Sequence, residues 1–167
     1  MIDRRILLST AAGLAAGWFS LSGKSHAAEK TAGKFPVEKT PEEWKRQLTP
    51  AQYHILREEG TEPAFSSPLN KEHRKGTFAC AGCDQALFAS ETKFDSGTGW
   101  PSFYDHLPNA IGTTTDRSYF MVRTAVHCSR CGGHLGHVFN DGPKPTGLRY
   151  CMDGLALVFH PATPSAT

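Results

Sequence analysis

The stretch CSRCGGHLGHVFNDGPKPTGLRYC, residues 128–151, decides the fold of this chain. It opens on a C-x-x-C pair and continues through HLGHVF, a short apolar run typical of a strand. The turn-rich segment NDGPKPTG follows and leads into a second strand-like run, LRYC, which ends at Cys151. The stretch therefore joins a cysteine pair, two predicted strands and a single thiol.

A second C-x-x-C pair, CAGC at residues 80–83, lies upstream. A gap of two residues lets both sulfurs of a pair reach one ion, and two such pairs complete a closed tetrahedral Zn²⁺ site of the structural kind. The predicted zinc ligands are Cys80, Cys83, Cys128 and Cys131. Two disulfides, or thioredoxin-like redox pairs, are the alternatives. Neither pair lies in a βαβ pattern, which weighs against the redox alternative.

The segments around these cysteines predict short strands and few helices. The chain holds 16 Gly and 11 Pro, which favours many turns. Alternating or β-branched runs predict strands at 76–80, 86–90, 110–115, 119–128, 134–139, 148–152 and 155–160. Upstream, Thr40 with Glu43 and Thr49 with Gln52 form capping boxes, which predict two short helices between 41 and 58. We predict a small, mainly β domain with antiparallel sheets and short N-terminal helices.

Residues 1–27 have the pattern of an export signal. A basic start, MIDRR, precedes an uncharged apolar run, and SHA at 25–27 matches a signal-peptidase site. Arg4-Arg5 followed by ILL resembles a Tat signal, with a general secretory signal or a membrane anchor as alternatives. We therefore expect export, to a bacterial periplasm, and no stable membrane insertion after cleavage. A flexible arm at 28–40, the main domain at 41–160 and a disordered tail at 161–167 are expected to follow.

Charge excludes some classes of partner. The first 27 residues hold three of the 18 basic and one of the 16 acidic side chains, so the remainder has a formal net charge of zero. Such a balance gives no sign of binding to nucleic acid or to an anionic membrane surface. We expect a monomer without a nucleic-acid partner.

Cys151 is the cysteine that the two pairs leave over. An odd cysteine in an exported protein is a reactive thiol or an intermolecular link, and a buried inert thiol is a third possibility. Arg149 would share a strand face with Cys151 and favour the thiolate, whereas Asp153 would oppose it or orient Arg149. His134 and His137, in the preceding predicted strand, can give or take a proton. Their alternative role is to bind the metal or support its ligands.

The remaining unusual element is GTGWPSF, residues 97–103. Gly97, Gly99 and Pro101 predict a tight loop that exposes Trp100 and Phe103. An aromatic side chain on such a loop can line a pocket for a methyl group or a sulfur. The alternative is that the Trp fills the core.

Together, GTGWPSF, CAGC and the stretch at 128–151 closely resemble the B-type peptide-methionine (R)-S-oxide reductases, over residues 41–160. The resemblance implies two antiparallel β-sheets, short N-terminal helices and a structural zinc held by the four paired cysteines. It implies that the Cys151 thiolate attacks the sulfoxide sulfur and becomes a sulfenic acid. It also implies His137 as proton donor with His134 assisting, Arg149 as support for the thiolate, and Trp100 as the wall for the substrate methyl.

The chain departs from the family pattern at two positions. Asp153 stands where the family usually has Asn, and Thr98 stands where some members have a cysteine that resolves the sulfenic acid. With four cysteines on zinc, recycling must use an external thiol reductant, such as a thioredoxin-like protein. The expected substrate is oxidised methionine, free or in proteins. A zinc-knuckle binding module and a thiol–disulfide oxidoreductase are the alternative functions.

Overall fold

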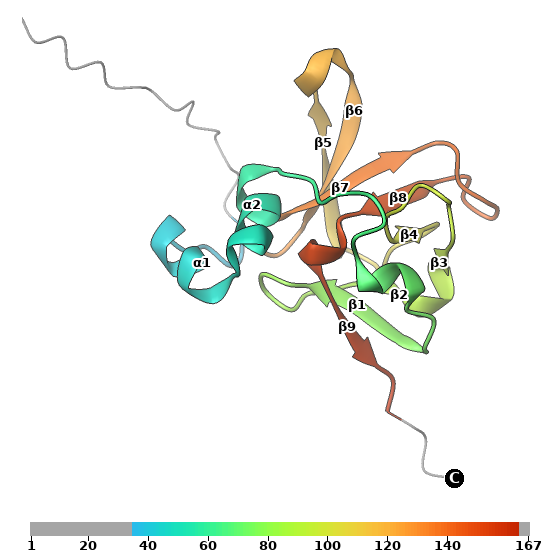
Figure 1. The fold of residues 1–167 in the computed structure, drawn as a ribbon, viewed down its shortest axis with the longest axis horizontal. Coiled ribbons are helices and arrows are strands. Elements are labelled where there is room, and N and C mark those ends of the chain that lie inside the picture. Colours follow the sequence, from blue (N-terminus) through green and yellow to red (C-terminus); the bar gives the residue numbers. More distant parts are fainter. Residues whose placement is uncertain (1–34, 164–167) are drawn as a thin grey trace, which may run out of the picture. The chain divides into compact units, whose positions relative to one another are not determined.

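The structure, a computed structural model, describes residues 35–163. The export signal predicted at 1–27, the arm up to residue 34 and residues 164–167 of the tail lie outside the described residues. In the described part, two short helices precede nine strands (Figure 1). The helices are α1 (Pro41–Gln47) and α2 (Pro50–Glu58). The strands are β1 (Gly76–Cys80), β2 (Ala86–Ala89), β3 (Lys93–Phe94), β4 (Ser102–Phe103), β5 (Ile111–Asp116), β6 (Arg123–Cys128), β7 (His134–Phe139), β8 (Arg149–Met152) and β9 (Leu157–Pro161).

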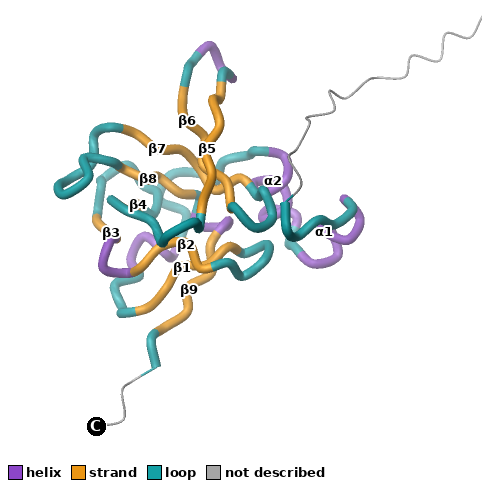
Figure 2. The backbone as a smooth tube through the Cα atoms, turned by 180° about the vertical axis from the view of Figure 1, so that it is seen from behind, coloured by secondary structure: helices purple, strands orange, loops and turns teal. Residues whose placement is uncertain are grey.

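The strands form two antiparallel sheets, as predicted. The smaller sheet has the order β2-β1-β9, and the larger has the order β3-β4-β8-β7-β6-β5. Figure 2 shows β9 and β1 on one side and the longer strands of the larger sheet on the other. Strands β6, β7 and β8 follow one another in space as in sequence, so the stretch at 128–151 links three adjacent strands of one sheet.

Both helices begin as their sequences predict. The Thr40 side chain accepts the Glu43 N–H while Glu43 bonds back to the Thr40 N–H, and Thr49 with Gln52 repeats this capping box. The helices bury Trp44 on α1 and Ile55 on α2. Within residues 35–163, neither helix is long and apolar enough to cross a membrane.

Aromatic side chains join the two sheets. Phe103, from the larger sheet, stacks on Phe88 at a centroid distance of 4.4 Å and meets Phe78 edge-on at 5.0 Å. All three rings are fully buried. The expectation that Phe103 is exposed beside Trp100 is therefore wrong. Residues 102 and 103 form a strand, β4, so Phe103 points into the core, where burial of a phenyl ring contributes about 1.5–3 kcal/mol.

Several boundaries differ from the sequence prediction. Strand β6 starts at Arg123 rather than 119, because residues 118–120 form a 3₁₀ turn. The described end of the expected flexible arm packs on the domain: Phe35 meets His127 edge-on, and the Val37 N–H donates to the Arg130 carbonyl at 2.8 Å. The domain also extends past residue 160, since β9 runs to Pro161 and the Ala162 N–H donates to the Lys75 carbonyl.

Candidate functional site: a four-cysteine cluster and a separate thiol

The two C-x-x-C pairs come together in the structure. One ligand atom from each of the four cysteines lies within 4.8 Å of the others. The Sγ atoms of Cys80 and Cys131 are 3.7 Å apart, and those of Cys83 and Cys128 are 3.5 Å apart. All are free thiols, which contradicts the disulfide alternative. The cluster can hold one metal ion and would clip the end of β1 to the end of β6.

Each pair lies in the same kind of turn. The Asp84 N–H donates to the Cys80 carbonyl at 2.8 Å, and the Gly132 N–H donates to the Cys128 carbonyl at 2.9 Å. The residue after each pair has a positive φ, 59° at Asp84 and 68° at Gly132. This left-handed residue turns the chain so that both sulfurs of a pair face the same point. The two C-x-x-C pairs thus adopt the same local structure.

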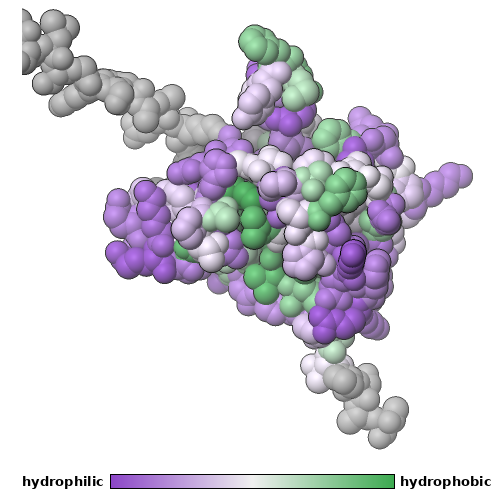
Figure 3. Space-filling model, viewed as in Figure 1, coloured by the Kyte–Doolittle hydropathy of each residue, from purple (hydrophilic) through white to green (hydrophobic). Residues whose placement is uncertain are grey.

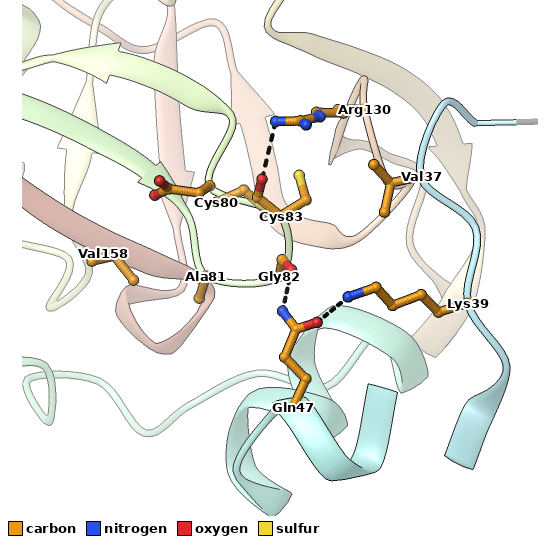
Figure 4. Close-up of a pocket in the computed structure, with 10 residues that line it drawn as sticks. Val37, Lys39, Gln47, Cys80, Ala81, Gly82, Cys83, Arg130 and Val158 are labelled. Atoms are coloured by element: carbon orange, nitrogen blue, oxygen red, sulfur yellow. Dashed lines mark hydrogen bonds between the residues drawn. The ribbon is translucent and has the colours of Figure 1, made fainter. Parts of the chain in front are cut away.

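The N-terminal segment and α1 hold the first cysteine turn in place (Figure 4). Gln47 donates to the Gly82 carbonyl at 2.5 Å, and Lys39 in turn contacts Gln47. From the other cysteine turn, Arg130 donates to the Cys83 carbonyl at 3.2 Å, as the dashed line in Figure 4 shows. Side chains of α1 and of the second cysteine turn therefore bond the carbonyls of the first turn, and Arg57 of α2 donates to the Cys131 carbonyl of the second turn at 2.9 Å.

Cys151 lies apart from this cluster, in the middle of the larger sheet. On β8 it pairs with Ser102 of β4 on one side and with His137 of β7 on the other. Strand pairing therefore places a hydroxyl and an imidazole beside the thiol. The neighbouring Gly136 has φ 144°, and a Cβ there would lie 2.2 Å from the Cys151 carbonyl oxygen. Only glycine allows β7 to approach the Cys151 backbone so closely.

A cleft of about 120 Å³ opens at Cys151. The cleft is lined by Thr61, Trp100, Arg123, Gly136, His137, Phe139, Cys151 and Asp153. The indole of Trp100 is half-buried, and its Nε1–H donates to the Glu62 carbonyl at 3.1 Å. The structure thus brings Cys151, His137, Trp100 and Asp153 into one cavity, but Phe103 does not line it.

A chain of hydroxyl groups leads from β4 to the thiol. Ser102 and Ser96 are 2.7 Å apart, Ser96 and Thr98 are 2.8 Å apart, and the Thr98 Oγ1 lies 3.7 Å from the Cys151 Sγ. Each hydroxyl both donates and accepts, so the chain can present a donor to the sulfur. Thr98 is thus beside Cys151, at the position where part of the resembled family has a second cysteine.

The environment of Cys151 disfavours the thiolate in the resting state. Burial raises the pKa of the Cys151 thiol above its usual value. The nearby Asp153 charge also raises this pKa, whereas the hydrogen bonds from Thr98 and Ser102 and the charge of Arg149 lower it. The thiol therefore needs a nearby base to become a nucleophile near neutral pH.

His137 pairs with Cys151 across β7 and β8 and lines the same cleft. Its Nε2 lies 2.8 Å from Asp116 Oδ2 on β5, and the Arg123 guanidinium bonds the same carboxylate at 2.6 Å. Hydrogen bonds from Ser118, His137 and Arg123 hold the pKa of Asp116 below its usual range, so this carboxylate is ionised. Because the ionised Asp116 carboxylate accepts a hydrogen bond, the His137 Nε2 carries a hydrogen, and the Nδ1 of the ring is left to interact with other groups. His134 is buried next to it, with ring centroids 5.3 Å apart, and the metal-binding cluster includes neither histidine.

Arg149 is fixed by two partners other than Cys151. Its Nε and Nη2 donate to the two carboxylate oxygens of Asp141, both at 2.8 Å, and its Cζ lies 4.4 Å from the Phe139 ring centroid. This arrangement corrects the expectation that Asp153 orients Arg149. The segment 140–148 folds back so that Asp141 lies beside β8, where it forms a bidentate ion pair with Arg149.

Asp153 instead bonds to the loop after α2. Strand β8 ends at Met152, so the Asp153 side chain turns to accept the Glu62 N–H at 2.9 Å. The Glu62 carboxylate in turn accepts the N–H groups of Gly154 at 2.5 Å and Leu155 at 3.2 Å. Burial and, to a smaller extent, the Glu62 charge raise the pKa of Asp153 to about 7, although the hydrogen bond from the Glu62 N–H lowers it. Burial raises the pKa of Glu62 as well.

Several residues of the site were not found from the sequence. Glu62 lies 91 residues from Asp153, and Asp116 lies 21 residues from His137, so no local spacing links either pair. Ser102 was missed because β4 is only two residues long and carries no periodic pattern. One signal did exist for Asp141: the turn-rich segment predicts a loop that must return to β8 close to Arg149.

The fold and the site define a class: a small β protein with a four-cysteine metal-binding cluster and a separate thiol in a cleft. The family model described as SelR domain matches residues 48–161. Peptide methionine sulfoxide reductase MsrB of Methanosarcina barkeri is 58% identical over 124 residues, 74% of this chain and 87% of that protein. The same protein of Agrobacterium fabrum is 54% identical over 126 residues, 75% of this chain and 93% of the relative.

A third relative, MsrB of Leptospira interrogans, is 54% identical over 126 residues, which are 75% of this chain and 96% of that protein. The chain therefore belongs to the MsrB family of peptide methionine sulfoxide reductases, the family of the SelR domain.

Proposed function

We propose that this chain reduces the R epimer of methionine sulfoxide, free or in proteins, through Cys151, and so repairs oxidised proteins. The observation that carries the proposal is the separation of the five cysteines. Four form one cluster, and the fifth lies in a cleft with Trp100 and His137. A thiol outside a metal cluster, next to a proton-exchanging group, has the arrangement of a nucleophile and its base.

In the proposed reaction, the Cys151 thiol gives its proton to His137 as its sulfur attacks the sulfoxide sulfur. His137 then delivers a proton to the sulfoxide oxygen. The attack forms an S–S bond. This bond and the S–O bond of the sulfoxide then break as the protonated oxygen moves to the Cys151 sulfur, which yields methionine and a sulfenic acid. The sulfoxide gains two electrons and the cysteine loses two. Thr98 and the Arg149 charge favour the thiolate during the attack, and His134 packs against His137 and supports its orientation.

Trp100 is proposed to form the wall against which the substrate methyl group packs. Its indole is held by the bond to the Glu62 carbonyl, so the ring face keeps one orientation in the cleft. A soft, polarisable group such as a methyl next to sulfur gains dispersion energy on an aromatic face. One rigid wall also distinguishes the two epimers, because oxygen and methyl exchange places between them.

Recycling is proposed to use an external thiol. The four clustered cysteines are committed to the metal, and Thr98 has no thiol to form a disulfide with Cys151. Two external thiols, from a thioredoxin-like protein, would convert the sulfenic acid to a thiol and water, with formation of their own disulfide.

The ion in the cluster is proposed to be one structural Zn²⁺. Tetrahedral zinc with Zn–S bonds of about 2.3 Å holds its sulfurs roughly 3.8 Å apart. The Sγ–Sγ separations of 3.7 and 3.5 Å in the structure are close to this value. With four thiolates the shell is closed, so the ion would contribute to folding rather than to chemistry. Metal analysis of the purified protein tests this: about one zinc per chain is expected.

Export to a bacterial periplasm is proposed from the first 27 residues, with Arg4 and Arg5 as the Tat-type pair. Replacement of both by Lys in the full chain should keep the protein in the cytoplasm if the Tat pathway carries it. Unchanged export would point to the general secretory pathway instead.

The proposed activity is tested with resolved epimers. The full chain, supplied with dithiothreitol, should reduce N-acetylmethionine-R-sulfoxide and leave the S epimer unchanged. Equal rates with both epimers would contradict the assigned stereochemistry, and no turnover with either would contradict the function.

A further inference from the structure

The tip of the β5–β6 hairpin carries four consecutive apolar residues that face solvent. We define the hairpin tip as residues 119–122. The exposed fractions are 81% for Tyr119, 109% for Phe120, 47% for Met121 and 70% for Val122. The hairpin projects away from the rest of the sheet in Figure 1, and its end is coloured as apolar in Figure 3.

Neither packing nor backbone geometry accounts for aromatic residues here. Tyr119 has φ 52° and Phe120 has φ 58°, a left-handed conformation that glycine adopts readily and other L residues rarely do. A fully exposed Phe gains no burial from folding. Contiguous exposed apolar residues on a soluble domain mark a surface that contacts another molecule.

The hairpin tip is continuous with the catalytic cleft. The strands that carry it hold Asp116 and Arg123, which bond each other beside His137. Arg123 lines the cleft itself and two hollows next to it. One hollow, of about 290 Å³, contains Val122 and Phe139. The other, of about 400 Å³, contains Tyr119. A surface therefore leads from Cys151 over Arg123 to the tip.

The size of the cleft determines which part of a substrate lies on the surface between Cys151 and the hairpin tip. Pockets that enclose a drug-sized ligand span about 300–1,000 Å³. The cleft at Cys151, about 120 Å³, has room for one side chain. The backbone and neighbouring residues of a protein substrate must then lie outside the cleft, over the adjoining hollows.

We propose that the hairpin tip binds apolar side chains that flank methionine sulfoxide in an extended segment of the substrate protein. This inference rests on the proposed function and deepens it, since it names the substrates that are reduced fastest. Oxidised methionines that are normally buried lie among apolar neighbours, and unfolding exposes both together. The tip would thus direct the enzyme to unfolded, oxidised proteins.

The experiment measures kcat and KM of the full chain with three substrates. They are N-acetylmethionine-R-sulfoxide, a nine-residue peptide with one central methionine-R-sulfoxide between Leu and Val residues, and the same peptide with Ser and Gly in their place. The tip variant is Tyr119→Ser/Phe120→Gly/Val122→Ser. The control is Val158→Ser, an exposed apolar residue on β9 that lines none of the three hollows at Arg123.

The wild type should prefer the Leu/Val peptide to the Ser/Gly peptide by roughly tenfold in kcat/KM, mainly through KM, because one or two apolar side chains are buried. The tip variant should lose that preference and keep its rate on N-acetylmethionine-R-sulfoxide. The control should behave as the wild type.

Three results would overturn the inference. The tip variant could retain the peptide preference, or it could lose activity on N-acetylmethionine-R-sulfoxide equally, which would mean that the tip acts through Arg123. It could also keep the peptide kinetics and instead abolish a dimer seen by light scattering or binding to phosphatidylglycerol vesicles. Absence of wild-type activity on all three substrates would overturn the proposed function itself.

Discussion

At the scale of single residues, the site depends on how the charges around Cys151 are arranged. Burial and Asp153 raise the pKa of the thiol, while Arg149 and the Thr98 hydroxyl lower it. Because the pKa of Asp153 is itself raised to about 7, this carboxyl carries little charge below that pH. A protonated Asp153 can also donate a hydrogen bond, as the Asn usual in the resembled family can.

The first prediction concerns stability against pH. The pKa of Asp153 is about 7 in the folded protein and about 4 in an unfolded chain. Between pH 4 and pH 7 the folded protein binds a proton at Asp153 that the unfolded chain releases. The contribution of this proton to the free energy of unfolding is complete below about pH 4 and is lost as the pH rises through 7. The free energy of unfolding should fall by a few kcal/mol, on the order of 1.4 per pKa unit, between pH 4 and pH 8.

Urea denaturation at several pH values measures this slope. Asp153→Asn should flatten it, apart from the contribution of Glu62, whose pKa is also raised. The exposed Asp105→Asn is the control and should leave the slope unchanged. A wild type that becomes more stable between pH 5 and pH 8 would show that Asp153 is ionised throughout.

The second prediction concerns the reactivity of the same site. Removal of the Asp153 charge should lower the pKa of Cys151, and the effect should grow above pH 7, where the carboxyl ionises. The rate of iodoacetamide alkylation against pH, with mass spectrometry to count the label on Cys151, reports that pKa. A raised or unchanged pKa in Asp153→Asn would contradict the account.

The roles of single residues were partly readable from the sequence. The count of five cysteines in two pairs and one left over assigns Cys151 a separate use. The spacing of Trp100 and Phe103 within one loop did not tell which faces the cleft, because that depends on the pairing of β4 with β8. Long-range bonds such as Asp153 to Glu62 have no local signal.

At the scale of elements, two loops shape the cleft. The loop 97–101 supplies Thr98 and Trp100. The loop after α2 supports it, since the Phe65 N–H donates to the Gly99 carbonyl at 2.7 Å and Asn70 donates to the same oxygen at 2.9 Å. Gly99 has φ 95°, and a Cβ there would lie 2.9 Å from Ala64 and Phe65 atoms, so only glycine permits this close contact.

The third prediction uses the position of loop 97–101. The Thr98 Oγ1 lies 3.7 Å from the Cys151 Sγ, so Thr98→Cys places two sulfurs within reach of a disulfide after a small shift. After one turnover, the variant should lose water from its sulfenic acid and form a disulfide between the introduced thiol and Cys151, detected by peptide mapping. Ser96→Cys is the control, because the Ser96 hydroxyl bonds Thr98 and Ser102 rather than Cys151. A sulfenic acid that persists in Thr98→Cys would mean that the loop is too rigid.

The fourth prediction concerns the cysteine turns at the ends of β1 and β6. Cys131→Ser removes one of four ligands, so the variant should lose its metal and most of its folding free energy. Circular dichroism and metal analysis check both. Cys151→Ser, the control outside the cluster, should keep the metal and the fold. A folded, metal-free Cys131→Ser protein would show that the cluster is dispensable.

Elements with strong local signals were predicted well. Both helices begin at their capping boxes, and β7 matches its predicted range, 134–139. The two-residue strands β3 and β4 were missed because pairing partners, rather than their own sequence, define them. The predicted strand at 119–128 was too long, since an apolar run on an exposed hairpin tip has the composition of a buried strand.

At the scale of the whole molecule, the chain separates stability from chemistry. The four-cysteine cluster joins β1 to β6, and Cys151, the proposed nucleophile, lies apart from it in the middle of the larger sheet. The two sheets share a core of aromatic residues, which fixes the strands around Cys151. Antiparallel sheets, short helices and the cysteine pairs could be predicted from the sequence, whereas the packing of one sheet on the other could not.

The central claim is that Cys151 alone performs the reduction while the other four cysteines hold a metal. One measurement tests it most directly: the full chain, with all external thiols removed, is mixed with one equivalent of N-acetylmethionine-R-sulfoxide, trapped with dimedone and analysed by mass spectrometry. The account predicts about one N-acetylmethionine per chain, a dimedone adduct on Cys151 and an intact cluster. A disulfide between Cys151 and Cys80, Cys83, Cys128 or Cys131, or a dimedone adduct on one of those four residues in place of Cys151, would contradict it.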